Sequence, residues 1–172
     1  ENFIFSSSAA VYGYPEYLPI NEKHPLKPIN YYGFSKLMIE KQLLWYNKLK
    51  ALNIVCLRYF NACGYDIKGR IIMKEKNPQN LLPIVMEVAS GIRNEMSIFG
   101  NDYDTEDGTC LRDYIHVNDL AIAHLKAIKK IQDNSRIITN VATGKFHSVL
   151  DVINETEKIT GKKINYTIDK RR

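Results

Sequence analysis

The sequence predicts an α/β protein built around a buried sheet, and two kinds of segment indicate it. Short runs of nearly continuous apolar residues at 2–5, 53–61 and 137–141 are typical of strands buried on both faces. The longer segments 30–50 and 118–131 carry apolar residues at helical spacing. With 172 residues, the chain can bury one sizeable core and part of a second.

Composition and charge exclude several classes of protein. The formal charge of +5 is mild and its lysines are spread over many segments, so we expect no nucleic-acid binding. No apolar run is long enough to span a bilayer. Three cysteines, Cys56, Cys63 and Cys110, have neither metal-ligand spacing nor an even number for disulfides, which fits a reducing compartment such as the cytoplasm. The chain begins without Met and ends just after an Arg pair, so we expect an internal piece of a longer protein.

The first strand, at 2–5, runs directly into Ser6, Ser7 and Ser8. Small hydroxyl residues at the end of a buried strand are typical of the carboxyl edge of an α/β sheet, where ligands bind. A serine-rich turn is the alternative, because Gly13 and Pro15 follow. The proline-rich segment 15–28 is expected to be a surface loop.

The segment 30–50 predicts a long helix with Asn30 at its N-cap. Tyr32 and Lys36, four residues apart, would share one face of this helix. A neighbouring ammonium favours a phenolate and can lower a tyrosine pKa of about 10 by about 1–3 units, toward the range of a general base. An ordinary surface pair is the alternative, since this spacing is common.

The same helix carries apolar residues on more than one side. A helix that lies on a sheet with its back in water needs only one such stripe. We therefore expect a partner on the second side, most simply another copy of the chain in a homodimer, with a second layer of the same chain as the alternative. The expected stripes are Phe34, Leu37, Met38, Leu44 and Trp45, and Ile39, Leu43 and Tyr46.

Later segments add further candidate residues. Tyr59, Phe60 and Asn61 end the strand at 53–61, where aromatic rings could wall a flat heteroaromatic ligand or simply close the core. Arg112 suits bidentate phosphate recognition, with an Arg–Asp pair at a strand end as the alternative. The carboxylates of 102–108 lack the spacing of a calcium loop, so we expect no metal.

The remaining elements are read from local signals. A helix is expected over 81–92, a strand at 97–99, and a last strand at 163–168. Ser148 should cap a further helix that Gly161 ends. His116 is expected to be structural.

In this order, the segments closely resemble the UDP-glucose (UDP-galactose) 4-epimerases, members of the extended short-chain dehydrogenase/reductase superfamily. Tyr32 and Lys36 alone indicate only the superfamily, whereas residues 98–109 and 112–121 indicate the epimerases. The resemblance covers essentially the whole chain through the runs 3–13, 32–40, 57–61, 80–83, 98–109, 112–121 and 148–152.

The resemblance implies a partial Rossmann-like, doubly wound parallel sheet plus part of a smaller α/β substrate-binding domain. Residues 1–66, completed by about 113–145, would form the C-terminal half of the NAD-binding domain. Residues 67–112 and 146–172 would belong to the UDP-sugar-binding domain. The family's glycine-rich NAD-binding turn is missing from this sequence, so the 172 residues alone are expected to be inactive.

The implied reaction interconverts UDP-glucose and UDP-galactose with NAD as cofactor, through a 4-keto sugar and without a metal. Tyr32 would act as the base, Ser8 would hydrogen-bond the reacting oxygen, and Lys36 would bind the nicotinamide ribose. NAD would also contact Ser6, Tyr59 and Phe60. The residues implied to bind the UDP-hexose are Asn61, Asn80, Leu81, Ser97, Phe99, Arg112, Tyr114, Val149 and Arg172.

Departures from the family pattern include one beside the site, and two alternative functions are also open. Family members usually carry Thr where Ala10 stands, which removes one hydroxyl beside the sugar. A related nucleotide-sugar dehydratase or decarboxylase is an alternative, but the 4,6-dehydratases need acidic residues where Ala9 and Ala10 follow Ser8. A non-catalytic nucleotide-sugar-binding protein is the other alternative, and the presence of Ser8, Tyr32 and Lys36 argues against it.

Overall fold

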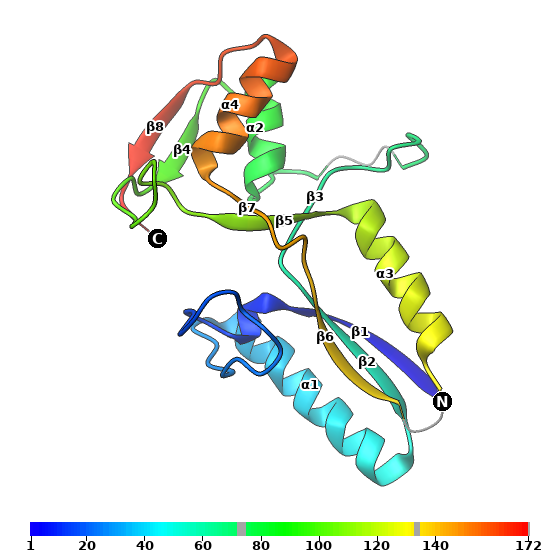
Figure 1. Cartoon of the computed structure of the whole chain (residues 1–172). Coiled ribbons are helices and arrows are strands. Elements are labelled where there is room, and N and C mark those ends of the chain that lie inside the picture. The colour runs from blue at the N-terminus through cyan, green and yellow to red at the C-terminus, as the bar shows by residue number, and fades with distance from the viewer. Residues whose placement is uncertain (72–74, 133–134, 172) are drawn as a thin grey trace. The chain divides into compact units, whose positions relative to one another are not determined.

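The computed structural model describes residues 1–71, 75–132 and 135–171, and it divides the chain into two compact units (Figure 1). Unit 1 consists of Glu1–Ala62 and Tyr114–Gly144, and unit 2 of Cys63–Asp113 and Lys145–Arg172. Each unit is therefore assembled from two separate stretches of chain. The sequence placed the first boundary at 66/67, whereas the structure places it at 62/63, inside strand β3 (Asn61–Cys63).

Unit 1 contains a parallel sheet with the strand order β1-β2-β6. Its strands are β1 (Asn2–Ser8), β2 (Asn53–Tyr59) and β6 (Arg136–Val141). Ser8 pairs with Tyr59, and Tyr59 pairs with Val141, so the three strands end in line at one edge. β2 is buried over its first six residues, as its continuous apolar sequence predicts.

Two helices cover opposite faces of this sheet (Figure 1). On one face, Ile54 and Cys56 of β2 pack with Leu43 of α1 (Tyr31–Lys50). On the other, Val55 and Leu57 of β2 pack with Ala127 of α3 (Val117–Lys130). Alternate residues of a strand point to opposite faces, so a central strand covered on both sides must be apolar throughout. This is the predicted doubly wound α/β arrangement.

Unit 2 has its own smaller core. Strands β4 (Met96–Phe99) and β8 (Tyr166–Asp169) pair in parallel, and the helices α2 (Leu81–Ala89) and α4 (Val149–Thr160) pack against them. The chain of unit 2 also contains β7 (Phe146–His147), which pairs antiparallel with the start of β5 (Arg112–His116). The buried residues of this core are Val85, Val88, Met96, Ile98, Ile153 and Ile164.

The caps that the sequence predicts are present. Asn30 accepts a hydrogen bond from the Gly33 amide at 2.8 Å. Ser148 and Asp151 form a reciprocal capping box at the start of α4, and Gly161 ends that helix in the left-handed conformation at a φ of 65°. His116 is structural, as expected: its Nδ1 accepts a hydrogen bond from the Asn118 amide at the start of α3.

Several elements differ from the prediction at their ends, most clearly α2 and β8. Helix α2 stops at Ala89 instead of continuing to 92, because the chain turns through Gly91 at a φ of 76°. Strand β8 begins at Tyr166 rather than 163, while Ile164 fills the core just before it. The strands β3, β5 and β7 and the 3₁₀ turn η1 (Ala9–Val11) were not predicted. Among the described residues, every helix is too short or too polar to span a membrane.

The apolar faces of α1 are distributed differently from the prediction. Its buried side carries Leu37 and Leu43, which the sequence assigned to separate stripes, together with Gly33 and Glu40. The predicted stripes were therefore wrong. They were built from apolar residues alone, whereas the buried face of the helix also includes the carboxylate of Glu40. The opposite side is apolar and exposed, and we call it the outer face of α1: Phe34, Met38, Ile39, Trp45 and Tyr46, with 37–59% of each side chain exposed.

Candidate active site

The three serines at the end of β1 have three different surroundings. Ser6 lies within hydrogen-bond distance of His124 on α3, with 3.0 Å between Oγ and Nε2. Ser7 is completely buried. Ser8 caps η1 by accepting a hydrogen bond from the Ala10 amide at 3.2 Å, and 8% of it remains exposed. The predicted carboxyl-edge position of these hydroxyls is therefore present in unit 1.

Lys36 connects the first turns of α1 to β1. Its Nζ donates a hydrogen bond to the main-chain oxygen of Ser6 at 3.0 Å. The same nitrogen lies 5.5 Å from the centre of the Tyr32 ring and 5.1 Å from that of Phe5. Tyr32 is half exposed, so its ring is open to a ligand while the ammonium stays beside it. Lys36, Tyr32 and the end of β1 are thus brought together.

Gly33 explains how closely α1 approaches the turn after Ser8. A β-carbon at this position would lie 2.4 Å from the carbonyl oxygen of Ala10 and 3.1 Å from Cβ of Pro28. The contact with the Ala10 carbonyl could not be accommodated without moving main chain. A glycine between Tyr32 and Lys36 therefore lets the first turn of the helix pack directly on η1, which follows Ser8.

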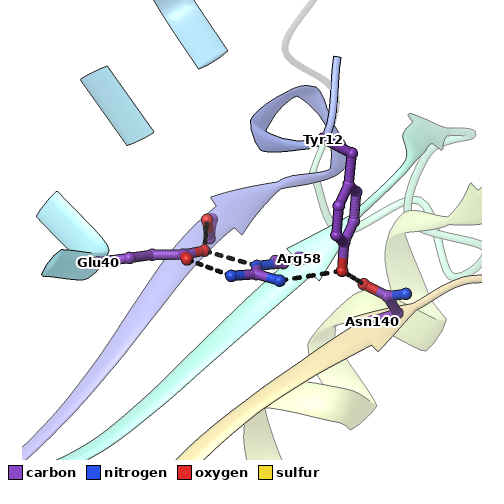
Figure 2. Close-up of polar contacts among 5 residues, drawn as sticks. Tyr12, Glu40, Arg58 and Asn140 are labelled. Carbon is purple, nitrogen blue, oxygen red and sulfur yellow. Dashed lines mark hydrogen bonds and ion pairs between the residues drawn. The ribbon is translucent and has the colours of Figure 1, made fainter. Parts of the chain in front are cut away.

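A buried polar network lies one turn further along α1 (Figure 2). Arg58 donates two hydrogen bonds to the carboxylate of Glu40, from Nε at 2.9 Å and from Nη2 at 2.5 Å. Glu40 also accepts a hydrogen bond from the Ser7 hydroxyl at 2.5 Å. Nη1 of Arg58 donates to the Tyr12 hydroxyl at 3.0 Å, and Tyr12 donates to Asn140 at 2.6 Å. The network thus joins α1, all three strands of the sheet and the segment after η1.

The charges in this network are almost fully enclosed: the side chains of Arg58 and Glu40 are 3% and 1% exposed. Burial opposes the charge on Arg58, but its hydrogen bonds to Glu40 and Tyr12 outweigh burial, and its pKa is raised. For Tyr12, burial raises the pKa and outweighs the hydrogen bonds to Arg58 and Asn140, which lower it. Sequence reasoning missed this network. The available signals were an Arg within an apolar strand and a Glu four residues after Lys36.

The other residues predicted for cofactor binding in unit 1 are at the end of β2. Tyr59 is half-buried and packs against the hydrophobic cluster on the α3 side of the sheet. Phe60 follows it and is also half-buried. Asn61 begins β3. Tyr59 and Ser8 are direct register partners, so an aromatic ring and a hydroxyl lie side by side at the sheet edge.

The predicted substrate residues are divided between the units. In unit 2, Asn80 occupies the N-cap of α2 and Leu81 packs against the core. Ser97 and Phe99 are half-buried on β4, and exposed Arg112 begins β5 opposite His147. Val149 begins α4, whereas Tyr114 falls in unit 1, and Arg172 lies outside the described residues.

The acidic loop before β5 supports the start of α4. The carboxylate of Asp107 accepts hydrogen bonds from the amide and hydroxyl of Thr109, both at 2.8 Å, and from the Ser148 hydroxyl. The Thr109 hydroxyl in turn accepts a bond from the Val149 amide at 3.1 Å. Burial raises the pKa of Asp107, but these hydrogen bonds outweigh it and the pKa is lowered. In the part of the chain that the structure describes, no three His, Cys, Asp or Glu residues are grouped to hold a metal.

Comparison with known proteins identifies the family. Residues 1–142 match the model of the NAD dependent epimerase/dehydratase family. The chain belongs to this family. The UDP-glucose 4-epimerase of Halalkalibacterium halodurans is 46% identical over 173 residues, and the human UDP-glucose 4-epimerase is 47% identical over 176. The resemblance stated from the sequence is therefore confirmed.

Solved structures of the family share this fold. The UDP-glucose 4-epimerase of Bifidobacterium longum in complex with NAD+ and UDP matches 99% of the chain at a TM-score of 0.93 and 44% identity. That of Brucella ovis in complex with NAD matches all of it at a TM-score of 0.93 and 40% identity. The predicted fold class is thus confirmed. The chain spans about half the length of these relatives: 51–52% of the two proteins and 52–53% of the two structures.

Proposed function

We propose that the protein is a UDP-hexose 4-epimerase that interconverts UDP-glucose and UDP-galactose. The observation that carries the proposal is the arrangement at the end of β1: the ammonium of Lys36 lies beside the Tyr32 ring and on the Ser6 carbonyl. Identities of 46–47% to named UDP-glucose 4-epimerases over the whole chain support the same substrate class.

The residues at this sheet edge fit one end of an NAD molecule. The strands end in line, and ligands of open parallel sheets bind beyond the carboxyl ends of the strands. In the proposal, Lys36 and Ser6 supply polar contacts, while Tyr59 and Phe60 supply aromatic surface. Held by these residues, NAD would supply the hydride acceptor and donor for C4 of the sugar.

The chain's own residues handle the proton and the oxygen. We assign Tyr32 as the base that takes the proton of the sugar 4-hydroxyl, because its ring is half exposed and a cation lies beside it. Lys36 is the counter-charge to the phenol oxygen and is held in place by the Ser6 carbonyl. Ser8, which retains some exposure, hydrogen-bonds the reacting oxygen and relays the proton.

The same proposal assigns the nucleotide to a larger set of residues. Epimerisation requires a weak hold on the sugar and a firm hold on the UDP, since the keto sugar must turn over while the nucleotide stays bound. In the proposal, Arg112 and Tyr114 bind the phosphate and ribose region, and the half-buried ring of Phe99 contacts the uracil. The proposed UDP-hexose contacts are Asn61, Asn80, Leu81, Ser97, Phe99, Arg112, Tyr114, Val149 and Arg172.

We further propose that the protein is a homodimer through α1. The outer face of α1 exposes five large apolar side chains on a helix whose other side already packs on the sheet. Exposed apolar surface of this kind is typical of an interface. A second copy fits it because the same face on both subunits would be self-complementary about a twofold axis.

The deciding experiment measures epimerisation of UDP-galactose by wild type and by Tyr32→Phe. Because the chain spans about half the length of its relatives, the assay uses the product of the complete coding sequence, with any residues that flank these 172. Removing a general base costs about 10²–10⁴-fold in rate. Tyr14→Phe, at an exposed tyrosine that has no role in the proposal, is the control and should keep full activity. Full activity of Tyr32→Phe would overturn the assignment.

A further inference from the structure

Besides its apolar packing, helix α1 is joined to β1 by two hydrogen bonds that are one helical turn apart. At the first, Nζ of Lys36 donates to the Ser6 carbonyl at 3.0 Å. At the second, the Glu40 carboxylate accepts from the Ser7 hydroxyl at 2.5 Å. Tyr32, Lys36 and Glu40 follow one another at a spacing of four residues, so all three lie along one face of the helix.

The second attachment is reinforced by β2. Arg58 binds both carboxylate oxygens of Glu40 and leaves that side chain a single orientation (Figure 2). The far side of the guanidinium is fixed through the Tyr12 hydroxyl to Asn140 on β6. Glu40 is therefore oriented by groups on all three strands of the sheet.

These two hydrogen bonds lie along the face of α1 that carries Tyr32. The two attachment points involve neighbouring residues of β1, Ser6 and Ser7, immediately before Ser8. A helix bonded at one point can rotate or slide, whereas bonds at two successive turns restrict both movements. A buried ion pair is also weak evidence for stability, because well-packed apolar residues can replace one at no loss. The buried pair of Glu40 and Arg58 is therefore better explained by orientation than by stability.

We propose that Glu40, Arg58 and Ser7 are positioning residues, which hold α1 so that Tyr32 and Lys36 face the reacting oxygen beside Ser8. The inference rests on the proposed function for its effect on catalysis. A misplacement of about 1 Å caused by a change far from the chemistry can lower a rate by about 100-fold.

The test uses two variants of the protein expressed from its complete coding sequence. Ser7→Ala removes the hydrogen bond from β1 and leaves the ion pair intact. Glu40→Met with Arg58→Met removes both buried charges together, so that neither is left unpaired. Lys50→Met on the same helix changes an exposed charge to the same apolar residue and is the control. For each variant, kcat, KM for UDP-galactose and the melting temperature are measured.

We expect both variants to lower kcat by about 10- to 100-fold while KM stays within about threefold, since ground-state binding is unaffected. Lys50→Met should match the wild type. Wild-type kcat in a folded double variant would overturn the inference. If the double variant does not fold, wild-type kcat in Ser7→Ala would overturn the inference instead. Absence of epimerase activity in the wild type would instead overturn the proposed function.

Amide hydrogen exchange supplies a readout that does not depend on turnover. Loss of the second attachment should speed exchange about tenfold at residues 33–37 in the first turns of α1, and leave α3 unchanged. A purely structural role would speed exchange in both helices. Unchanged exchange at 33–37 in both variants would show that the network does not hold this part of the helix, and would overturn the inference.

Discussion

Gly33 lies so close to the carbonyl oxygen of Ala10 that a β-carbon at position 33 would come within 2.4 Å of it. This contact ties the first turn of α1 to the turn that follows Ser8. A glycine usually destabilises a helix relative to alanine. Here it is favourable, because the missing side chain permits this packing.

The first prediction is that Gly33→Ala destabilises the protein. In an exposed helix the change would stabilise by about 1 kcal/mol, but overpacking against main chain typically costs about 1–3 kcal/mol. We expect a lower free energy of unfolding in urea, with Gln42→Ala on the exposed side of α1 as the control. A Gly33→Ala protein more stable than wild type would contradict the close packing of α1 on η1.

The second prediction concerns acid stability in unit 2. The pKa of Asp107 is lowered from 3.8 in the folded state. The stability that its carboxylate contributes is therefore fully present above pH 3.8 and is lost as the pH falls through the folded pKa. Asp107→Asn should cost about 1 kcal/mol at pH 7, a figure reduced for partial exposure. The difference from wild type should shrink below about pH 4. Urea unfolding across pH measures it.

Asp104→Asn is the control for Asp107. It changes an exposed carboxylate of the same loop and should alter stability little at any pH. A gap between wild type and Asp107→Asn that stays constant down to pH 3 would argue against a charged hydrogen-bond acceptor at residue 107.

The third prediction is that Cys56 is unreactive in the folded protein. Burial raises the pKa of its thiol to about 12, with the Glu40 carboxylate adding to the effect. At pH 8 only about 1 in 10⁴ molecules would carry the reactive thiolate. Iodoacetamide should label Cys110 at least about 100-fold faster than Cys56, as read by peptide mass spectrometry. In urea the two rates should converge; similar rates before unfolding would refute the burial of Cys56.

The fourth prediction tests the homodimer. Met38→Glu with Trp45→Glu places two charges on the outer face of α1 and should raise the dimer dissociation constant at least about tenfold, because buried aromatic anchors dominate interfaces. Sedimentation velocity measures the constant. Ile159→Glu, an exposed apolar residue on α4, is the control and should leave association unchanged. Identical sedimentation of the α1 variant and the wild type would exclude this interface.

Local signals explain what could be predicted from the sequence. Asn30, Ser148 and Gly161 act on neighbouring residues, so the helix ends that they mark were predicted from short stretches of chain. The burial of β2 could also be predicted from the sequence, because a strand covered on both faces has nearly continuous apolar residues.

Long-range pairing explains what could not be predicted. Glu40 is buried because Arg58 and Ser7, 18 and 33 residues away, satisfy its carboxylate, and no local pattern marks such a residue. Strand β7 has two residues and exists only because β5 pairs with it. The role of Tyr32 could be proposed from its spacing to Lys36, but the contact of Lys36 with Ser6 depends on the packing of α1 on β1.

The interleaving of the two units along the chain has a consequence for synthesis on the ribosome. Strand β2 is made long before β6, and β4 waits for β8, which lies about seventy residues further on. The open edges of β2 and β4 must therefore remain unpaired until these later strands have emerged. Such nascent edges are the segments that aggregate most readily, so during translation this protein should depend on chaperones to shield them.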